Sequence, residues 1–382
     1  MLKIDIMNNP FVTTGYAGEE YFCDRVEETA DLRSLLTNEH NVALISPRRL
    51  GKTELINHIF DCDEFRNSYY CFLVDIYATK SLSDFVNLLG KSLLETLKPR
   101  GKTVWEGFLR SLSSIRSEIS FDINGMPSWS IGLGEIRNPA VTLDEIFAYL
   151  QAADRPCIVA IDEFQQITKY GDSTVEATIR TYVQRTTNAH FIFSGSQRHL
   201  MDGMFTSASR PFYQSVTIMN LQPLSVDKYT EFAEEKFEER GKSIDPEVVP
   251  LLYSRFGGVT SYIHRILNVL FSRTEKGGKC SADMIEDAVD FIVRLSSDTY
   301  QSLLYQMPVK QRDVFLAIAM AGSATEVTGS SFIRKYGLVS PSSVSSAVNA
   351  LLDKDFITND RGAYSVYDKF FLLWLERQGY LA

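Results

Sequence analysis

A short basic loop has the residue types and spacing that hold phosphate groups. The segment Ser46-Pro47-Arg48-Arg49-Leu50-Gly51-Lys52-Thr53-Glu54 follows the apolar run 42–45 and opens an amphipathic helical pattern. Backbone N–H groups of such a loop can surround a β-phosphate, and the following helix N-terminus adds a favourable dipole. Gly51 lets the backbone approach closely, Lys52 can bridge two phosphates, and the Thr53 hydroxyl can ligate Mg²⁺. The loop therefore predicts a nucleoside di- or triphosphate site.

The first position of this loop departs from the pattern G-x-x-x-x-G-K-[ST]. Ser46 stands where the pattern has glycine. Serine would be strained in a left-handed conformation, so either Ser46 is not left-handed or the affinity for nucleotide is reduced. A chance Gly-Lys-Thr at a helix start is a second interpretation, and it loses weight only because another motif accompanies the loop.

That second motif is an apolar strand pattern at 156–161 that ends in Asp162 and Glu163. Continuously apolar strands are typical of central parallel strands, whose carboxyl ends bind ligands. We expect Asp162 to hold Mg²⁺ together with Thr53, and Glu163 to orient and deprotonate an attacking water, with Lys52 as the second catalytic residue. A solvated acidic turn is the alternative, which the phosphate loop disfavours.

A further apolar strand pattern at 190–194 leads to Ser196. A hydroxyl at this place, beside the phosphate and magnesium strands, can sense a γ-phosphate. A simple helix cap at Ser196 explains the residue equally well.

These residues must be positioned by alternating strands and helices, the pattern of a parallel α/β sheet covered by helices. Expected strands are 42–45, 70–75, 157–161 and 190–194, and expected helices are 27–38, 53–61, 83–98, 143–153 and 174–185. Alternating apolar residues around Asn124-Gly125 predict a β-hairpin insertion near 117–135. We expect three domains: an ATPase-like α/β domain over 1–221, a helical lid over 222–298, and a winged helix-turn-helix over 299–382.

The bulk composition excludes several classes of protein. A net charge of −9 disfavours general binding to nucleic acid, and the five scattered cysteines form no metal-ligand spacing. The sequence has neither an apolar run of about 20 residues nor a secretory signal pattern at its start, so we expect a cytoplasmic protein.

Taken together, the motifs resemble those of the archaeal-type ATPases of the STAND branch of the AAA+ superfamily. The resemblance runs through Asn9-Pro10-Phe11, Phe22-Cys23-Asp24-Arg25, the phosphate loop, Val74-Asp75-Ile76-Tyr77, Ile161-Asp162-Glu163-Phe164-Gln165, Phe193-Ser194-Gly195-Ser196 and Tyr367-Asp368-Lys369-Phe370-Phe371-Leu372-Leu373-Trp374-Leu375. It implies a P-loop NTPase fold with a helical lid and a winged helix, and ATP or ADP with Mg²⁺ as cofactors.

The resemblance also assigns residues. It implies that Phe22 and Arg25 lie near the adenine, that Asp162 is the magnesium acid, and that Glu163 is the catalytic acid. Two features depart from the family. The lid turn 257–260 lacks the family's proline, and a basic residue expected near position 214 is a glutamine, which leaves Arg198 and Arg210 as weak candidates for a charge-stabilising arginine.

In the C-terminal region, residues 341–352 form the expected recognition helix. Val344, Ala347, Val348 and Leu351 recur at helical spacing, which leaves serines and Asn349 outward. Charges over 301–382 nearly balance, so we favour a winged helix that packs or binds a protein partner, including a second copy of itself. DNA binding through Arg334, Lys335 and Arg361 is the alternative.

Three functions follow from these observations. The first is an ATP-driven, slowly hydrolysing switch that changes how the winged helix is presented. The others are an ATP-responsive DNA-binding regulator and a nucleotide-locked scaffold without turnover. His199 and His264 are lone histidines with expected surface or core roles, and Trp374 is expected in the core.

Overall fold

The computed structural model describes residues 9–360 and 362–381, apart from the side chain of Arg116. Arg361, which the sequence places in the wing, lies outside the described residues. The chain divides into two units, and each has its own interior. The first comprises the residues up to 236 together with 258–265, and the second comprises 237–257 and the residues from 266 onward. The division falls inside the segment expected as the lid, and the three expected domain boundaries stay predictions.

The first unit is built on a five-stranded sheet with the order β2-β5-β6-β1-β7. Its strands are β1 (Val42–Ile45), β2 (Tyr70–Asp75), β5 (Cys157–Asp162), β6 (Ala189–Gly195) and β7 (Thr217–Asn220). Every neighbouring pair is parallel, which confirms the predicted fold class. The sequence analysis did not predict β7, a short edge strand whose residues are only partly buried.

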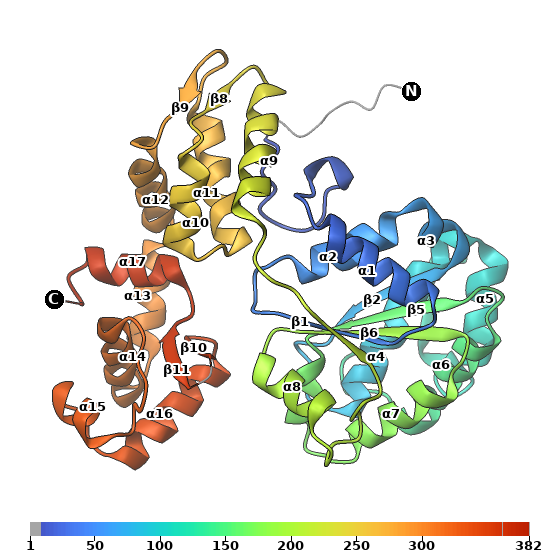
Figure 1. Cartoon of the computed structure of the whole chain (residues 1–382). Helices are drawn as coiled ribbons and strands as arrows, with labels where there is room; N and C mark the ends of the chain where they lie inside the picture. The colour runs from blue at the N-terminus through green and yellow to red at the C-terminus, as the bar shows by residue number, and fades with distance from the viewer. Residues whose placement is uncertain (1–8, 361, 382) are drawn as a thin grey trace. The chain divides into compact units, whose positions relative to one another are not determined.

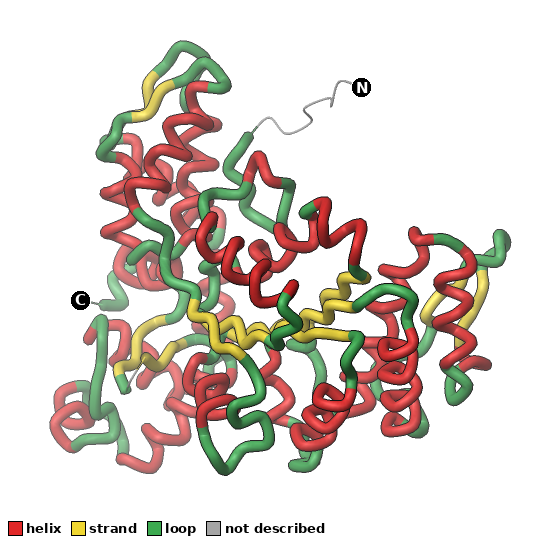
Figure 2. Tube along the Cα trace, turned by 45° about the vertical axis from the view of Figure 1, so that its right-hand side comes forward, coloured by secondary structure: helices red, strands yellow, loops and turns green. Residues whose placement is uncertain are grey.

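Both faces of this sheet are covered by helices (Figures 1 and 2). Alternate residues of β1 enter different cores: Val42 and Leu44 pack on one face, Ala43 and Ile45 on the other. The first face carries α1 (Val26–Thr37), α2 (Lys52–Asp61) and α3 (Asp63–Ser68). The second carries α4 (Leu82–Leu97), α5 (Lys102–Ser111), α6 (Pro139–Ala152), α7 (Val175–Arg185) and α8 (Arg198–Thr206). The carboxyl ends of buried strands are thereby held rigidly.

A small antiparallel sheet, β3 (Ile119–Phe121) with β4 (Pro127–Trp129), lies where the alternating pattern predicts a hairpin. The strands are shorter than the pattern indicates, and the expected continuation of β4 through Ile131 does not pair with β3. Instead, the Asn87 side chain on α4 donates to the Ile131 carbonyl (3.3 Å) and accepts from the Trp129 indole (3.0 Å). These contacts direct the chain onto α4.

The second unit is mostly helical. Within it, α10 (Val248–Phe256) and α12 (Met284–Leu295) accompany a two-residue parallel pair, β8 (Ser243–Ile244) and β9 (Lys279–Cys280). Helices α9 (Val226–Glu238) and α11 (Thr260–Arg273) have residues in both units. The remaining elements are α13 (Ser297–Gln306), α14 (Val309–Ala321), α15 (Ser330–Lys335), α16 (Pro341–Asp353), β10 (Ile357–Asp360), β11 (Ala363–Val366) and α17 (Lys369–Arg377). A helix-turn-helix followed by a β-ribbon is the arrangement of a winged helix, as predicted.

The packing of α16 follows its sequence pattern. Val344, Ala347, Val348 and Leu351 are buried, whereas Asn349 and most of the serines are exposed. Phe370, Phe371 and Trp374 on α17 are also buried, so their expected core role is confirmed. Among the described residues, no helix is both long enough and apolar enough to cross a bilayer.

Candidate functional site

The phosphate loop connects β1 to α2, as its sequence context predicts. Gly51 is left-handed (φ 91°), and so is Arg49 (φ 69°), a conformation that strains a residue with a Cβ atom. Ser46 does not have a positive φ, and its hydroxyl donates to the Pro47 carbonyl (2.9 Å). Serine at the first loop position is therefore unstrained, and the expected reason for a reduced affinity falls away.

Lys52 lies across the inside of this loop. Its side chain is 5% exposed, and Nζ is 3.3 Å from the Ser46 carbonyl and 3.4 Å from that of Pro47. Burial lowers the pKa of Lys52, while the nearby carboxylates of Asp162 and Glu163 counteract the shift. These contacts hold an ammonium group at the place where the loop would receive phosphate oxygens.

Thr53 and Asp162 meet, although 109 residues separate them in the chain. The Thr53 hydroxyl donates to Asp162 Oδ2 (2.6 Å), and Asp162 Oδ1 accepts from the Glu163 backbone N–H (3.0 Å). Two hard oxygen donors from different elements are the type of ligand that Mg²⁺ takes, so Thr53 and Asp162 would fit this ion. No cluster of three or more His, Cys, Asp or Glu side chains suited to a metal occurs among the described residues.

Glu163 is held by a set of polar contacts at the tips of β5 and β6. Its Oε2 accepts from the Ser196 hydroxyl (2.8 Å) and from the Gln165 amide. Arg48 Nε donates to the Ser196 hydroxyl (2.9 Å) and lies 3.9 Å from Glu163 Oε1. Glu163 itself is left-handed (φ 55°). Ser196 is not the cap of α8, because Gln197 has that position, so the helix cap that the sequence left open is wrong.

Two residues at this edge were missed as site residues by the sequence analysis. Gln165 donates to the carboxylate of Glu163, and Asp75 lies opposite Asp162 in the parallel register of β2 and β5. Partial desolvation raises the pKa of Asp75, an accepted bond from the Tyr77 N–H (2.8 Å) opposes that shift, and the charges of Asp162 and Glu163 add to it. The sequence signal for Asp75 was its place at the end of an apolar strand.

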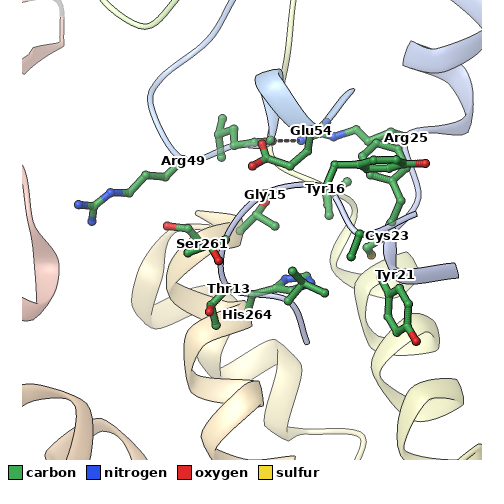
Figure 3. A pocket seen from close by; sticks show the side chains of 18 residues that line it. Thr13, Gly15, Tyr16, Tyr21, Cys23, Arg25, Arg49, Glu54, Ser261 and His264 are labelled. Atoms are coloured by element: carbon green, nitrogen blue, oxygen red, sulfur yellow. Dashed lines mark hydrogen bonds between the residues drawn. The ribbon is translucent and has the colours of Figure 1, made fainter. Parts of the chain in front are cut away.

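A cavity of about 130 Å³ adjoins the phosphate loop within the first unit. Figure 3 shows the side chains around it. Its lining comprises Val12, Thr13, Thr14, Gly15, Tyr16, Ala17, Tyr21, Phe22, Cys23, Arg25, Arg49, Leu50, Gly51, Glu54, Leu224, Thr260, Ser261 and His264. Six of the predicted nucleotide-site residues are thus in the lining. The others, with the residues predicted to bind metal or to act in catalysis, lie outside the lining, in the loop and at the strand tips.

Arg25 lines this cavity, and its guanidinium group is largely occupied by protein oxygens. The side chain is 3% exposed and donates to Glu28 Oε1 (2.5 Å), to the Gln222 carbonyl (2.6 Å) and to the Leu50 carbonyl (3.0 Å). Arg25 therefore joins α1, the segment after β7 and the phosphate loop. Phe22 is stacked on His58 of α2, with ring centroids 4.3 Å apart.

The start of α11 contacts the phosphate loop even though the turn before it lacks proline. The Ser261 backbone N–H donates to the Arg49 carbonyl (3.3 Å), and Arg49 Nη1 donates to the Tyr262 hydroxyl (2.7 Å). Of the two weak arginine candidates, Arg210 is paired with the buried Glu176 (Nε to Oε1, 3.3 Å), and Arg198 is the first residue of α8.

The fold and this constellation are those of a P-loop nucleotide-binding protein. Consistent with this, the family described as "ATPase domain predominantly from Archaea" matches residues 22–266, and that described as "Probable winged helix domain" matches 298–377. Since the first match covers more than half of the chain, the protein belongs to this ATPase family, and it binds adenine nucleotides as an ATPase domain. The comparison with curated proteins found no match.

Solved structures share the fold over nearly the whole chain. A Walker-type ATPase of Pyrococcus abyssi is 18% identical, with a TM-score of 0.61 over 96% of this chain and 99% of that one. The Aeropyrum pernix ORC1 protein in complex with DNA is 14% identical, with a TM-score of 0.54 over 94% of each chain. The Aeropyrum pernix ORC2 protein in ADPNP and ADP complexes is 13% identical, with a TM-score of 0.53 over 97% of each.

Proposed function

We propose that this protein is a slowly ATP-hydrolysing molecular switch of the STAND type, which couples its nucleotide state to the presentation of its winged helix. One observation carries the hydrolytic part of the proposal: Thr53 Oγ1 lies 2.6 Å from Asp162 Oδ2, and Asp162 directly precedes Glu163, whose backbone N–H donates to Asp162 Oδ1 (3.0 Å). A metal-binding pair next to a candidate base is what hydrolysis of a phosphoanhydride requires.

The residues then take the following roles. Loop amides and Lys52 bind the β- and γ-phosphates and neutralise their charge. Thr53 and Asp162 would hold Mg²⁺, which would supply positive charge to stabilise the charge that develops on the phosphates. Glu163 orients the attacking water and accepts its proton. Arg210 is engaged by Glu176 and does not supplement this charge, so we expect turnover to be slow.

Nucleotide binding would act on the contacts that hold Glu163. A γ-phosphate competes with the Glu163 carboxylate for the Ser196 hydroxyl and for Arg48, so its arrival frees the carboxylate to engage water. The signal would leave the site through Arg49, which contacts both Ser261 and Tyr262 at the start of α11. The winged helix then meets a protein partner, including a second copy of the chain, in only one nucleotide state.

Steady-state Mg-ATPase activity of the full chain tests the hydrolytic role. Glu163→Gln should lower turnover about a hundredfold or more, because it removes the base but leaves the loop intact. ATP affinity should stay within about threefold. The matched control is Glu39→Gln, since Glu39 is also left-handed (φ 65°) but exposed and outside the site. Equal turnover in the wild type and the Glu163 variant would remove Glu163 from the chemistry.

A DNA-binding regulator is the second candidate, favoured by the exposure of Arg334 and Lys335 immediately before the serine-rich outer face of α16. Retention on duplex DNA that falls steeply with salt, and that is weakened by a double Arg334→Ala, Lys335→Ala variant, would support it. The protein-partner proposal instead predicts no retention, at low salt, in any nucleotide state.

A further inference from the structure

The cavity has a polar feature at the start of α11 that the phosphate chemistry does not use. Thr260 and His264 are one helical turn apart and both line the cavity. In the view of Figure 3, His264 lies at the opposite end of the cavity from Glu54. Because Glu54 directly follows the phosphate loop, a nucleotide with its phosphates on that loop would extend its base toward the His264 end.

Three polar side chains of the lining already have partners. Arg25 donates to three oxygens, Tyr16 contacts His58 and Asp61, and Arg49 donates to a tyrosine. Thr260 Oγ1 is a buried atom to which the described residues offer no partner. His264 uses only Nδ1, which bonds the Tyr229 hydroxyl, and no described residue bonds Nε2. Two unused polar atoms on one helix face mark a binding surface, because such atoms are costly to bury without a partner.

The tautomer of His264 follows from counting protons around Tyr229. The Tyr229 hydroxyl has a single proton, and its oxygen lies near both the Thr260 carbonyl (3.4 Å) and His264 Nδ1. The carbonyl can only accept, so both contacts are satisfied when the tyrosine donates to Thr260 and Nδ1–H donates to the tyrosine oxygen. This arrangement leaves Nε2 without a proton, as a lone pair directed away from Tyr229.

The imidazole also stays neutral at physiological pH. His264 is buried beside Phe11 and Phe232, with ring centroids 6.0 and 6.1 Å away, and burial lowers its pKa to about 4. A neutral ring with this tautomer can accept a hydrogen bond at Nε2 but cannot donate one there.

From this geometry we infer that His264 selects the base of the nucleotide, its Nε2 accepting a hydrogen bond from the exocyclic amine of adenine while the Thr260 hydroxyl serves a ring nitrogen. Guanine and hypoxanthine carry a carbonyl oxygen in place of this amine, so two acceptors would face each other. The inference rests on the proposed nucleotide site and deepens it, because it assigns base specificity to the hydrogen-bonded unit of Tyr229 and His264.

Calorimetric titration of the full chain with ADP and with inosine diphosphate, both in Mg²⁺, tests the inference. Inosine diphosphate differs from ADP only in this amine and the adjacent ring proton. Wild type should bind ADP roughly tenfold to a hundredfold more tightly than inosine diphosphate, because a site that accepts a hydrogen bond from the base binds a base without that donor more weakly. His264→Ala should reduce the ratio of the two affinities to about threefold or less, mainly by weakening ADP.

Tyr229→Phe is the more specific variant, because it keeps the His264 imidazole but removes the hydroxyl that fixes which ring nitrogen carries the proton. Its ratio of affinities should fall toward that of His264→Ala. The matched control is Tyr70→Phe, which loses a hydroxyl bonded to Asp154 (3.0 Å) at the other end of the sheet and should keep the wild-type ratio. An unchanged ratio in the Tyr229 variant, with both nucleotides bound, overturns the inference alone. Absence of binding of either nucleotide to wild type overturns it together with the proposed function.

Discussion

Replacing Arg25 by alanine should lower the free energy of unfolding by about 3 to 4 kcal/mol. The guanidinium group is 3% exposed and makes three hydrogen bonds, to two backbone carbonyls and to Glu28. Each bond from a buried cation to a carbonyl contributes roughly 1.5 kcal/mol. The ion pair with Glu28 adds about 0.5 to 1 kcal/mol, because the Glu28 side chain is 28% exposed and water screens the pair.

The assay is urea unfolding followed by circular dichroism without nucleotide, with the stability of the first unit taken from its own transition. Arg33→Ala is the matched control on the same helix. Its ion pair with Glu64 (2.6 Å) joins side chains that are 57% and 39% exposed, so its loss should cost about 0.5 kcal/mol or less. ADP affinity should also fall in the Arg25 variant, since the Leu50 carbonyl loses its anchor. Equal destabilisation by the two substitutions would refute this reasoning.

Three further outcomes are expected. Ser196→Ala should slow ATP turnover about tenfold and leave ADP affinity within about twofold, since it removes the hydroxyl that orients the carboxylate of Glu163, the proposed base. Unchanged turnover would contradict a role for the contact between Ser196 and Glu163. The pKa of His264 falls from 6.5 to about 4 on folding, so the neutral ring should contribute fully to stability above pH 6.5, and about 3 kcal/mol of that contribution should be lost as the pH drops to 4. The free energy of unfolding from urea titrations should therefore fall more steeply with acid in wild type than in His264→Gln. Parallel curves for the two proteins would contradict burial of a neutral ring. Gly90→Ala should destabilise the protein by about 2 kcal/mol and shift tryptophan emission, because its Cβ would lie 2.4 Å from the Trp129 ring. A Cβ at Gly107 meets nothing within 4 Å, so Gly107→Ala should be neutral or slightly stabilising. Equal effects of the two substitutions would mean that the contact with Trp129 is absent.

The elements with strong local signals were predictable from sequence. The apolar strands β1 and β2 have the predicted bounds, and the buried residues of α16 follow the helical spacing of its sequence. The short edge strand β7 was not predicted because none of its residues is fully buried and its four residues give no sustained pattern. The hairpin was predicted with strands that were too long, since the Trp129 contact with α4 depends on tertiary packing.

The candidate site likewise has features that the sequence reveals and features that it does not. The phosphate loop and Asp162 could be recognised because strand, glycine and helix start are adjacent in sequence. The bonds of Arg25 reach carbonyls 25 and 197 residues away, and the bond of His264 to Tyr229 joins two helices, so neither partner carries a local signal. The left-handed backbone of Arg49 is likewise invisible, because an arginine in a loop gives no indication of φ.

The central claim is that the loop before α2 cradles a nucleotide whose metal is held by Thr53 and Asp162. Calorimetric titration of wild type and Lys52→Ala with ATP, each with Mg²⁺ and with excess chelator, tests this claim most directly. We predict tight binding by wild type that weakens at least about tenfold without Mg²⁺, and a loss of about a hundredfold or more in the variant. Equal affinities in all four titrations, or no binding by wild type, would contradict it.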